Sequence, residues 1–119
     1  MSIYQDIIID HYRNPRNFGK IENPSGTVSL HNPLCGDQIE MSIILEKNKV
    51  KEARFVGRGC AISLASASML TDKIKGMKKK GLINLDRDFI IKMLGIELSP
   101  NRLKCALLSL EAMKRILNF

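Results

Sequence analysis

This chain has no tryptophan and few other aromatic residues, with two tyrosines and four phenylalanines among 119 residues. Single-stranded nucleic acids bind proteins largely by stacking their bases on aromatic rings, so this scarcity argues against such a partner. Apolar runs are short as well, since none approaches the roughly 18 uninterrupted apolar residues of a membrane-spanning helix. We therefore expect neither a nucleic acid nor a membrane among the partners.

A secretion signal and a disulfide framework are also missing. Met1 to Asp10 carries no basic lead, and Asp6 interrupts its isoleucines, which is not the pattern of a cleaved secretory signal. The three cysteines are an odd number, and no two of them form a Cys-x-x-Cys pair. We therefore expect a cytoplasmic protein whose cysteines serve metal ligation or thiol chemistry rather than disulfides.

What the chain does contain is sufficient for one compact domain. Hydrophobic residues make up 45% of the sequence and charged residues 26%, a balance typical of globular proteins. The length fits a single domain, and we interpret residues 1–119 as one unit. The net charge of +7 is large enough to attract a polyanion or an acidic protein, without choosing between them.

The first half of the chain has the patterns of one helix and a small sheet. The one-sided spacing of isoleucines predicts an amphipathic helix from Ile3 to about Asn14, where Pro15 ends it. A loop rich in proline, glycine and asparagine follows, and then an edge strand is expected over residues 26–30. A β-hairpin is predicted next, with strands at 38–45 and 50–57 and a turn at 46–49.

The second half is predicted to be helical. The stretch from Cys60 to Lys75 is rich in alanine and serine, which suits a closely packed helix, whereas Lys73 to Gly81 is expected to fray into a solvated loop. Further helices are expected over Asp86–Leu94 and from about Asn101 to Leu117, the last one after a Ser-Pro cap. Strands followed by helices favour an α+β fold, with the helices packed on one face of a small antiparallel sheet.

The residues that could perform chemistry are the three cysteines and one aspartate. Cys35 and Asp37 are two residues apart in a Pro/Gly turn, so a thiol and a carboxylate can converge there on one ion. Cys60 comes at a predicted helix start, where unpaired N–H groups and the helix dipole stabilise a thiolate. Cys105 follows in the last helix. The gaps of 25 and 45 positions match no zinc-finger spacing, so folding would have to bring the thiols together.

Several of these side chains also have a purely structural interpretation. A lone helical cysteine such as Cys105 is commonly a small buried hydrophobe. His11 and His31 lie beside polar residues with no second imidazole nearby, which favours structural roles. The lysines between Lys73 and Lys80 form either a solvated loop or a docking point for a partner.

Four strings of residues together are similar to one protein family. In chain order they are Asp10-His11-Tyr12-Arg13-Asn14-Pro15-Arg16-Asn17, Asn32-Pro33-Leu34-Cys35-Gly36-Asp37, Gly57-Arg58-Gly59-Cys60-Ala61-Ile62-Ser63-Leu64-Ala65-Ser66-Ala67-Ser68 and Arg102-Leu103-Lys104-Cys105. With this order and spacing over nearly the whole chain, the sequence resembles the U-type iron–sulfur cluster assembly proteins, the family of IscU, SufU and the N-terminal domain of NifU.

The resemblance implies an α+β fold in which Cys35, Asp37, Cys60 and Cys105 converge on one exposed site. The implied site binds zinc, iron or a nascent [2Fe–2S] cluster and receives sulfur from a cysteine desulfurase. The desulfurase and a downstream cluster carrier or apo-protein are therefore the expected partners. Thiolates are good ligands for zinc and iron, and a carboxylate is a more exchangeable one. Cys35 is the expected persulfide acceptor, because its Pro/Gly turn can move at low cost.

The residues around the third cysteine distinguish branches of the family. IscU-like members carry a histidine directly before that cysteine, whereas this chain has Lys104, as SufU-like members do. The string Leu98-Ser99-Pro100-Asn101-Arg102 also differs from the Leu-Pro-Pro-Val-Lys that the IscU-dedicated chaperone reads. SufU-like members, however, usually have an insertion that the 45-position gap does not hold. The ligands resemble those of SufU, with Asp37 as the fourth.

Two functions stay open within that resemblance: a scaffold on which iron and sulfide combine, and a zinc-dependent relay of persulfide sulfur. The scaffold is favoured over the relay, which would be an enzyme, a sulfurtransferase. A structural-zinc domain that binds nucleic acid would use the net positive charge, but no recognised nucleic-acid motif supports it. A thiol oxidoreductase would need the missing Cys-x-x-Cys pair. The resident metal, the identity of the desulfurase and the oligomeric state stay open.

Overall fold

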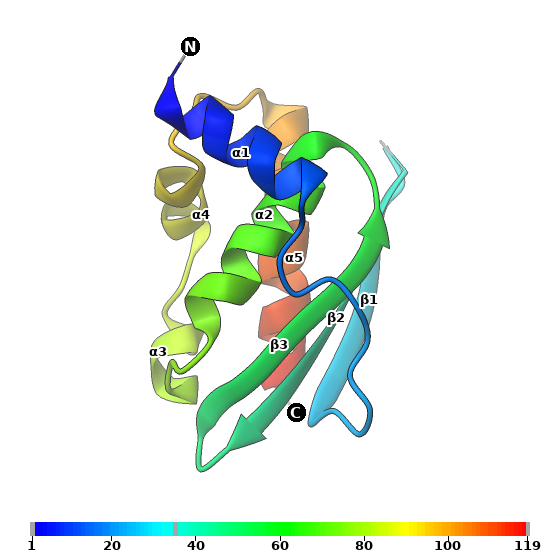
Figure 1. Cartoon of the computed structure of the whole chain (residues 1–119), viewed down its shortest axis with the longest axis vertical. Helices are drawn as coiled ribbons and strands as arrows, with labels where there is room; N and C mark the ends of the chain where they lie inside the picture. The colour runs from blue at the N-terminus through cyan, green and yellow to red at the C-terminus, as the bar shows by residue number, and fades with distance from the viewer. Residues whose placement is uncertain (1, 35, 119) are drawn as a thin grey trace.

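The computed structural model describes residues 2–34 and 36–118, in which helices pack against a three-stranded sheet (Figure 1). In chain order the elements are α1 (Ile3–Arg13), β1 (Gly26–Asn32), β2 (Asp37–Glu46), β3 (Lys49–Arg58), α2 (Ala61–Ile74), α3 (Lys79–Ile83), α4 (Arg87–Leu94) and α5 (Pro100–Leu117). None of the helices in these residues has the length and apolar content needed to cross a lipid bilayer.

The sheet is antiparallel throughout, in the order β1-β2-β3. Side chains alternate between the faces of a strand, so Ile39, Met41 and Ile43 of β2 all lie on one face, and all three are fully buried. The helices α2 and α5 contact that face. The expected α+β fold, with helices packed on one face of a small antiparallel sheet, is confirmed.

Small side chains let α2 pack closely in the middle of the molecule. The Ser66 hydroxyl donates to the Ala106 carbonyl of α5 at 2.8 Å. On another side of α2, the Ser68 hydroxyl accepts from the Arg16 N–H at 2.8 Å and lies 2.7 Å from the His11 Nδ1. Both serines are fully buried, so their hydrogen bonds replace the contacts with water that burial removes. The alternating serines thus tie α2 to α5 and to α1.

The lysine-rich segment between α2 and α4 forms the expected loop over residues 75–78, but this loop is hydrogen-bonded to another part of the chain and leads into a short helix. The backbone of residues 76–79 pairs with the β2–β3 turn through three hydrogen bonds of 2.7–2.9 Å, which involve Asn48 and Val50. A short helix, α3, then begins at Lys79, and its Leu82 side chain is fully buried. Local composition cannot predict these hydrogen bonds, because their partners lie in a turn about 30 residues earlier in the sequence.

The molecule is elongated, with extents of 41 × 26 × 24 Å. The β2–β3 turn and α3 lie at one end of the long axis, whereas the start of α2 and the start of α5 lie at the opposite end, near the beginning of β2 (Figure 1). The ends of three elements that are far apart in the sequence therefore meet in one place.

His11 leads to a prediction about the pH dependence of stability. Burial lowers the pKa of His11 below its usual 6.5, and the nearby Arg16 charge lowers it further, against the opposing effects of Asp72 and Asp10. The unfolded chain then binds the proton more readily than the folded chain. The contribution of neutral His11 to stability is therefore complete above about pH 6.5 and is lost as the pH falls through the folded-state pKa.

Urea unfolding of the wild type should accordingly show a midpoint that falls between about pH 7 and about pH 5. In His11→Gln, which keeps a side chain able to bond to Ser68 but cannot titrate, this fall should be smaller. An equal fall in both proteins would show that His11 does not contribute.

Candidate metal centre

Asp37 is the first residue of β2, and the alternation of the strand turns its side chain toward the helices. It lies on the same face as Ile39 and Met41, and it is only 2% exposed. Before it, the chain turns between β1 and β2, where the Gly36 N–H donates to the Asn32 carbonyl at 2.8 Å and Gly36 has a φ of +74°. The sheet register thus directs a buried carboxylate to the end of the sheet.

Cys60 is the N-cap residue of α2 and lies directly against this carboxylate. Its N–H donates to Asp37 Oδ1 at 2.9 Å, and its Sγ donates to Oδ2 at 3.6 Å. The first turn of α2 contains no acidic residue, and the Cys60 side chain makes no capping hydrogen bond. Asp37 therefore supplies the negative charge that the amino-terminal end of a helix favours.

Gly59 permits the close approach of Asp37 to α2. A Cβ atom at position 59 would lie 2.4 Å from Asp37 Oδ1 and 2.8 Å from its Cγ, distances that real Cβ contacts do not reach. The hydroxyl of Ser63, one turn into α2, would be 3.0 Å away. A side chain at this position would push the carboxylate out of its place.

Cys105 completes the cluster from α5, where it is 4% exposed. The ligand atoms of Asp37, Cys60 and Cys105 all lie within 4.8 Å of one another. They come from a strand, a helix cap and a second helix, which explains why the spacing of the cysteines did not match a local metal motif.

The donor set fits a zinc or ferrous ion. Zinc bonds of about 2.3 Å to sulfur and about 2.1 Å to oxygen, at tetrahedral angles, separate a sulfur from an oxygen by about 3.6 Å and two sulfurs by about 3.8 Å. Cys60 Sγ and Asp37 Oδ2 are 3.6 Å apart, and the other ligand atoms are within 4.8 Å. Two sulfur donors favour zinc or iron over magnesium or calcium.

Three of the four site residues named from the sequence, Asp37, Cys60 and Cys105, are therefore brought together. The fourth, Cys35, lies outside the described residues. Gly59 and Ser63 were not among the site residues named from the sequence; the buried Ser63 hydroxyl is 4.0 Å from Cys60 Sγ. Gly59 directly precedes the N-cap residue Cys60, and Ser63 follows it by three residues. These positions relative to a helix cap are the signal that could have identified them.

Two grooves are lined in part by residues that neighbour the cluster in the sequence or in the sheet. The lining of one groove includes Lys20, Glu40 and Arg58, and that of the other includes Asn32, Lys104 and Glu111. Arg58 and Lys104 are exposed and adjacent in sequence to Gly59 and Cys105. The cluster itself is less open than the exposed site that the resemblance implied, because Asp37 and Cys105 are buried and Cys60 is half-buried.

Comparisons with known proteins identify relatives over nearly the whole chain. The family model of the NifU-like N terminal domain matches residues 3–118. The zinc-dependent sulfurtransferase SufU of Bacillus subtilis (strain 168) is 37% identical, over 96% of this chain and 88% of its own length. The iron-sulfur cluster assembly scaffold protein IscU 1 of Archaeoglobus fulgidus is 34% identical, over 95% of this chain and 73% of its own length.

A solved structure agrees with these matches. FiSufU from the thermophile Fervidobacterium islandicum AW-1 superimposes with a TM-score of 0.80 at 26% sequence identity, over 98% of this chain and 96% of that one. Sequence and fold are therefore similar to the same group of proteins. The chain belongs to the family of the NifU-like N-terminal domain, which includes proteins named SufU and IscU.

Proposed function

We propose that this chain is an iron–sulfur cluster assembly protein. It accepts sulfur from a cysteine desulfurase and holds zinc, iron or a nascent [2Fe–2S] cluster on Cys35, Asp37, Cys60 and Cys105. The convergence of three of these ligand groups within 4.8 Å carries the proposal. Relatives named as IscU scaffolds and as a SufU sulfurtransferase support it.

Cys35 is the proposed fourth ligand because of its place in the chain. Two residues of polypeptide span at most about 7 Å, so the backbone of Cys35 cannot be far from that of Asp37. With Cys35, the site has three thiolates and one carboxylate. Thiolates hold zinc and iron strongly, whereas a carboxylate exchanges more readily, which suits a site that must release its cargo.

The Asp37 carboxylate also accepts a hydrogen bond from the thiol of Cys60. A cysteine must lose its thiol proton before it binds a metal. Asp37 Oδ2 accepts the Cys60 S–H at 3.6 Å, so this pair would release one proton to solvent if both groups bound a metal. Zinc, when bound, would hold the thiols as thiolates at neutral pH.

The sulfur-transfer step is assigned to Cys35. Its thiolate attacks the outer sulfur of the desulfurase persulfide; the S–S bond of the desulfurase breaks, its cysteine leaves as a thiolate, and a persulfide forms on Cys35. Cys60 is held at the helix cap by its N–H bond to Asp37, and Cys105 is buried in α5. Both are therefore less suited to reach another protein.

A zinc-dependent persulfide relay, a sulfurtransferase, is the second candidate. The 37% identity to a relative named zinc-dependent sulfurtransferase supports it, as does Lys104 in place of the histidine expected of IscU-like proteins. The two functions differ in what leaves the site: a cluster passes to a carrier or apo-protein, whereas a relay passes persulfide sulfur alone. We place either function in the cytoplasm, where reducing conditions maintain the thiols.

The overall proposal is tested by metal analysis of the protein purified anaerobically. Zinc or iron should be present near one equivalent per chain, and acid-labile sulfide should accompany iron after incubation with a desulfurase if the protein is a scaffold. Asp37→Ala should retain metal on the thiolates but release it to a chelator faster, because one of the four protein ligands is gone. Asp37→Asn, which keeps the acceptor for the Cys60 N–H, separates ligand exchange from folding. Unchanged exchange and transfer in both variants would reduce Asp37 to a turn residue.

Gly59→Ala tests whether the position of Asp37 matters. The new methyl group should displace the carboxylate, reduce stability by about 1–3 kcal/mol, and lower the affinity for zinc by about 10–100-fold. Zinc competition with a chromophoric chelator, together with urea unfolding, measures both effects. Gly81→Ala is the matched control, because its Cβ would meet only Met77 Cε at an ordinary 3.6 Å. Equal zinc affinities in the two variants would contradict the role of Gly59.

The sulfur acceptor is identified by trapping persulfide after reaction with a desulfurase. Mass spectrometry should find the additional sulfur on Cys35, and Cys35→Ser should lose it while Cys60→Ser and Cys105→Ser retain some labelling. Labelling confined to Cys105 would reverse the assignment and favour the scaffold over the relay. No labelling at any cysteine would argue against sulfur acceptance.

A further inference from the structure

Most of the net positive charge comes from two short segments, residues 46–51 and 75–80. Together they contain seven lysines and one acidic residue, whereas the rest of the chain contains twelve basic and eleven acidic residues. These segments therefore supply a charge of +6, and the remainder supplies +1, of the total of +7. The charge of this protein is a local feature rather than a general one.

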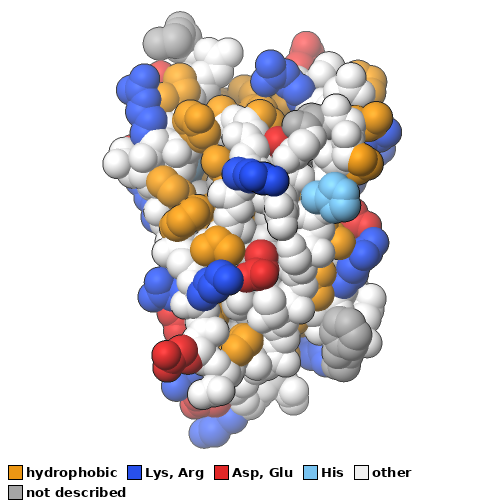
Figure 2. All heavy atoms as spheres, turned by 90° about the vertical axis from the view of Figure 1, so that its right-hand side faces the viewer, with side chains coloured by type: hydrophobic (Ala, Val, Ile, Leu, Met, Phe, Trp, Pro, Cys, Tyr) orange, Lys and Arg blue, Asp and Glu red, His pale blue; other side chains and the backbone are white. Residues whose placement is uncertain are grey.

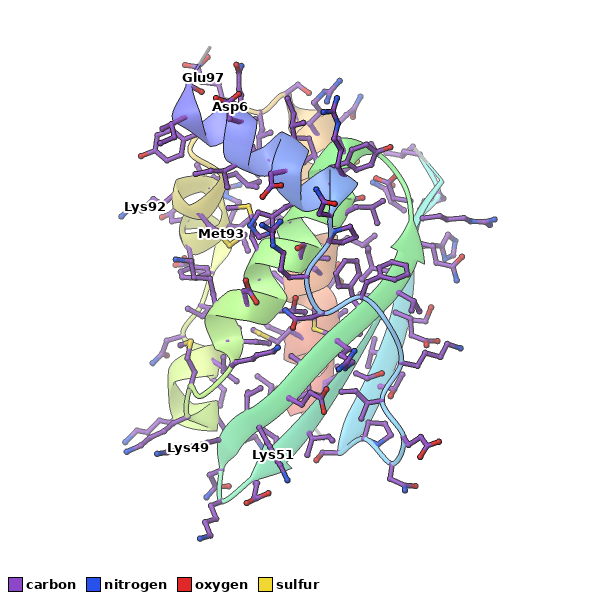
Figure 3. All side chains as sticks on the ribbon, viewed as in Figure 1. Asp6, Lys49, Lys51, Lys92, Met93 and Glu97 are labelled. Carbon is purple, nitrogen blue, oxygen red and sulfur yellow. The ribbon has the colours of Figure 1, made fainter. Side chains whose placement is uncertain are left out.

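The fold joins the two segments into one surface, which we name the lysine pole. The Val50 N–H donates to the Met77 carbonyl at 2.9 Å, the Gly76 N–H donates to the Val50 carbonyl at 2.8 Å, and the backbones of Lys49 and Lys78 lie opposite each other in a β-bridge. Figure 3 shows Lys49 and Lys51 at this end of the molecule, with their side chains directed outward. The exposed lysines of the pole are Lys47, Lys49, Lys51, Lys75, Lys78 and Lys80.

This arrangement is electrostatically unfavourable for the isolated protein. Like charges opposite each other in a β-ladder are destabilising, and Lys49 faces Lys78. Within residues 2–34 and 36–118, Lys51 is the only lysine of the pole that forms an ion pair, with Glu46 at 3.1 Å. A group of side chains that repel one another and so reduce stability is typical of a surface that serves a function.

The sheet side of the molecule provides the contrast. There Lys20 pairs with Glu40 and Arg54 pairs with Glu52. Figure 2 shows acidic side chains among the basic ones on that side. The excess of unpaired lysines is therefore concentrated at the pole.

We infer that the lysine pole is a docking surface for an acidic, Asp/Glu-rich segment of a partner protein. The pole lies at the opposite end of β2 from Asp37. A strand rises about 3.3 Å per residue, so the ten residues of β2 separate the pole from the metal centre by roughly 30 Å. A partner docked there leaves the metal centre accessible to a second protein. This inference does not depend on which metal or sulfur species the centre handles.

The chemistry of the pole favours an acidic protein over a nucleic acid or a membrane. Its segments contain no arginine and no aromatic residue, the side chains that most often recognise phosphates bidentately or stack on bases. They also expose no large apolar side chain that could enter a lipid surface. Lysines alone act as point charges, which suits flexible carboxylates and strengthens the encounter at low salt.

The test uses the full chain and fluorescent oligoglutamate as the probe. Lys49→Gln/Lys78→Gln/Lys80→Gln removes three exposed lysines of the pole that form no ion pair. Its affinity for the probe at low salt should be about tenfold lower than that of the wild type, with a weaker dependence on salt. The matched control, Arg87→Gln/Lys92→Gln/Lys114→Gln, loses the same charge from α4 and α5 and should bind nearly as tightly as the wild type. Amide NMR shifts caused by the probe should map to residues 46–51 and 75–80.

Circular dichroism and zinc content should be the same in both triple variants, which separates lost docking from lost folding or lost metal. Equal weakening by the two variants would show that only total charge matters and would overturn the inference. Probe-induced shifts around Cys60 and Cys105 would also overturn it. Tighter binding of oligothymidylate, or of vesicles of phosphatidylserine and phosphatidylcholine, than of oligoglutamate at equal salt would reject an acidic protein as the partner.

Discussion

The hydrogen bond from the Cys60 N–H to Asp37 Oδ1 joins the sheet to the central helix, and the candidate centre depends on it. Asp37 reaches this N–H because it shares a strand face with Ile39 and Met41, whose burial fixes the register of β2. A slip of one residue would turn the carboxylate to the opposite face and expose the core residues together with it. Core packing and ligand placement are therefore set by one register.

Cys105 depends on this same helix through a different contact. The buried Ser66 of α2 donates to the Ala106 carbonyl, directly after Cys105 in α5. That bond requires the two helices to approach closely, which the small residues of α2 allow. The distance between the Cys60 and Cys105 sulfurs is thus set by helix packing rather than by a loop. Because these two ligands are held rigidly, ligand exchange at the metal is expected at the other proposed ligands, Asp37 and Cys35.

The sequence was sufficient for the elements whose causes are local. Alternation over 38–45 and the Ser-Pro cap before α5 each encode their structure within a few residues, and both predictions are confirmed. The meeting of Asp37, Cys60 and Cys105 could not be derived from spacing, because it results from packing between distant elements; only the family resemblance indicated it. The lysine segment was predicted in part: α2 does end into a loop at residues 75–78, but the hydrogen bonds that tie this loop to the β2–β3 turn depend on residues far away in the sequence.

The β2–β3 hairpin gives the molecule two ends of different chemistry. At one end, a buried carboxylate and two cysteine sulfurs converge with few charges of their own, so that what binds there is decided by ligand geometry. At the other, exposed lysines act over a Debye length of about 10 Å and select by charge alone. Because a hydrogen-bonded hairpin connects them, an interaction at the lysine end can orient the whole molecule without rearranging the ligands.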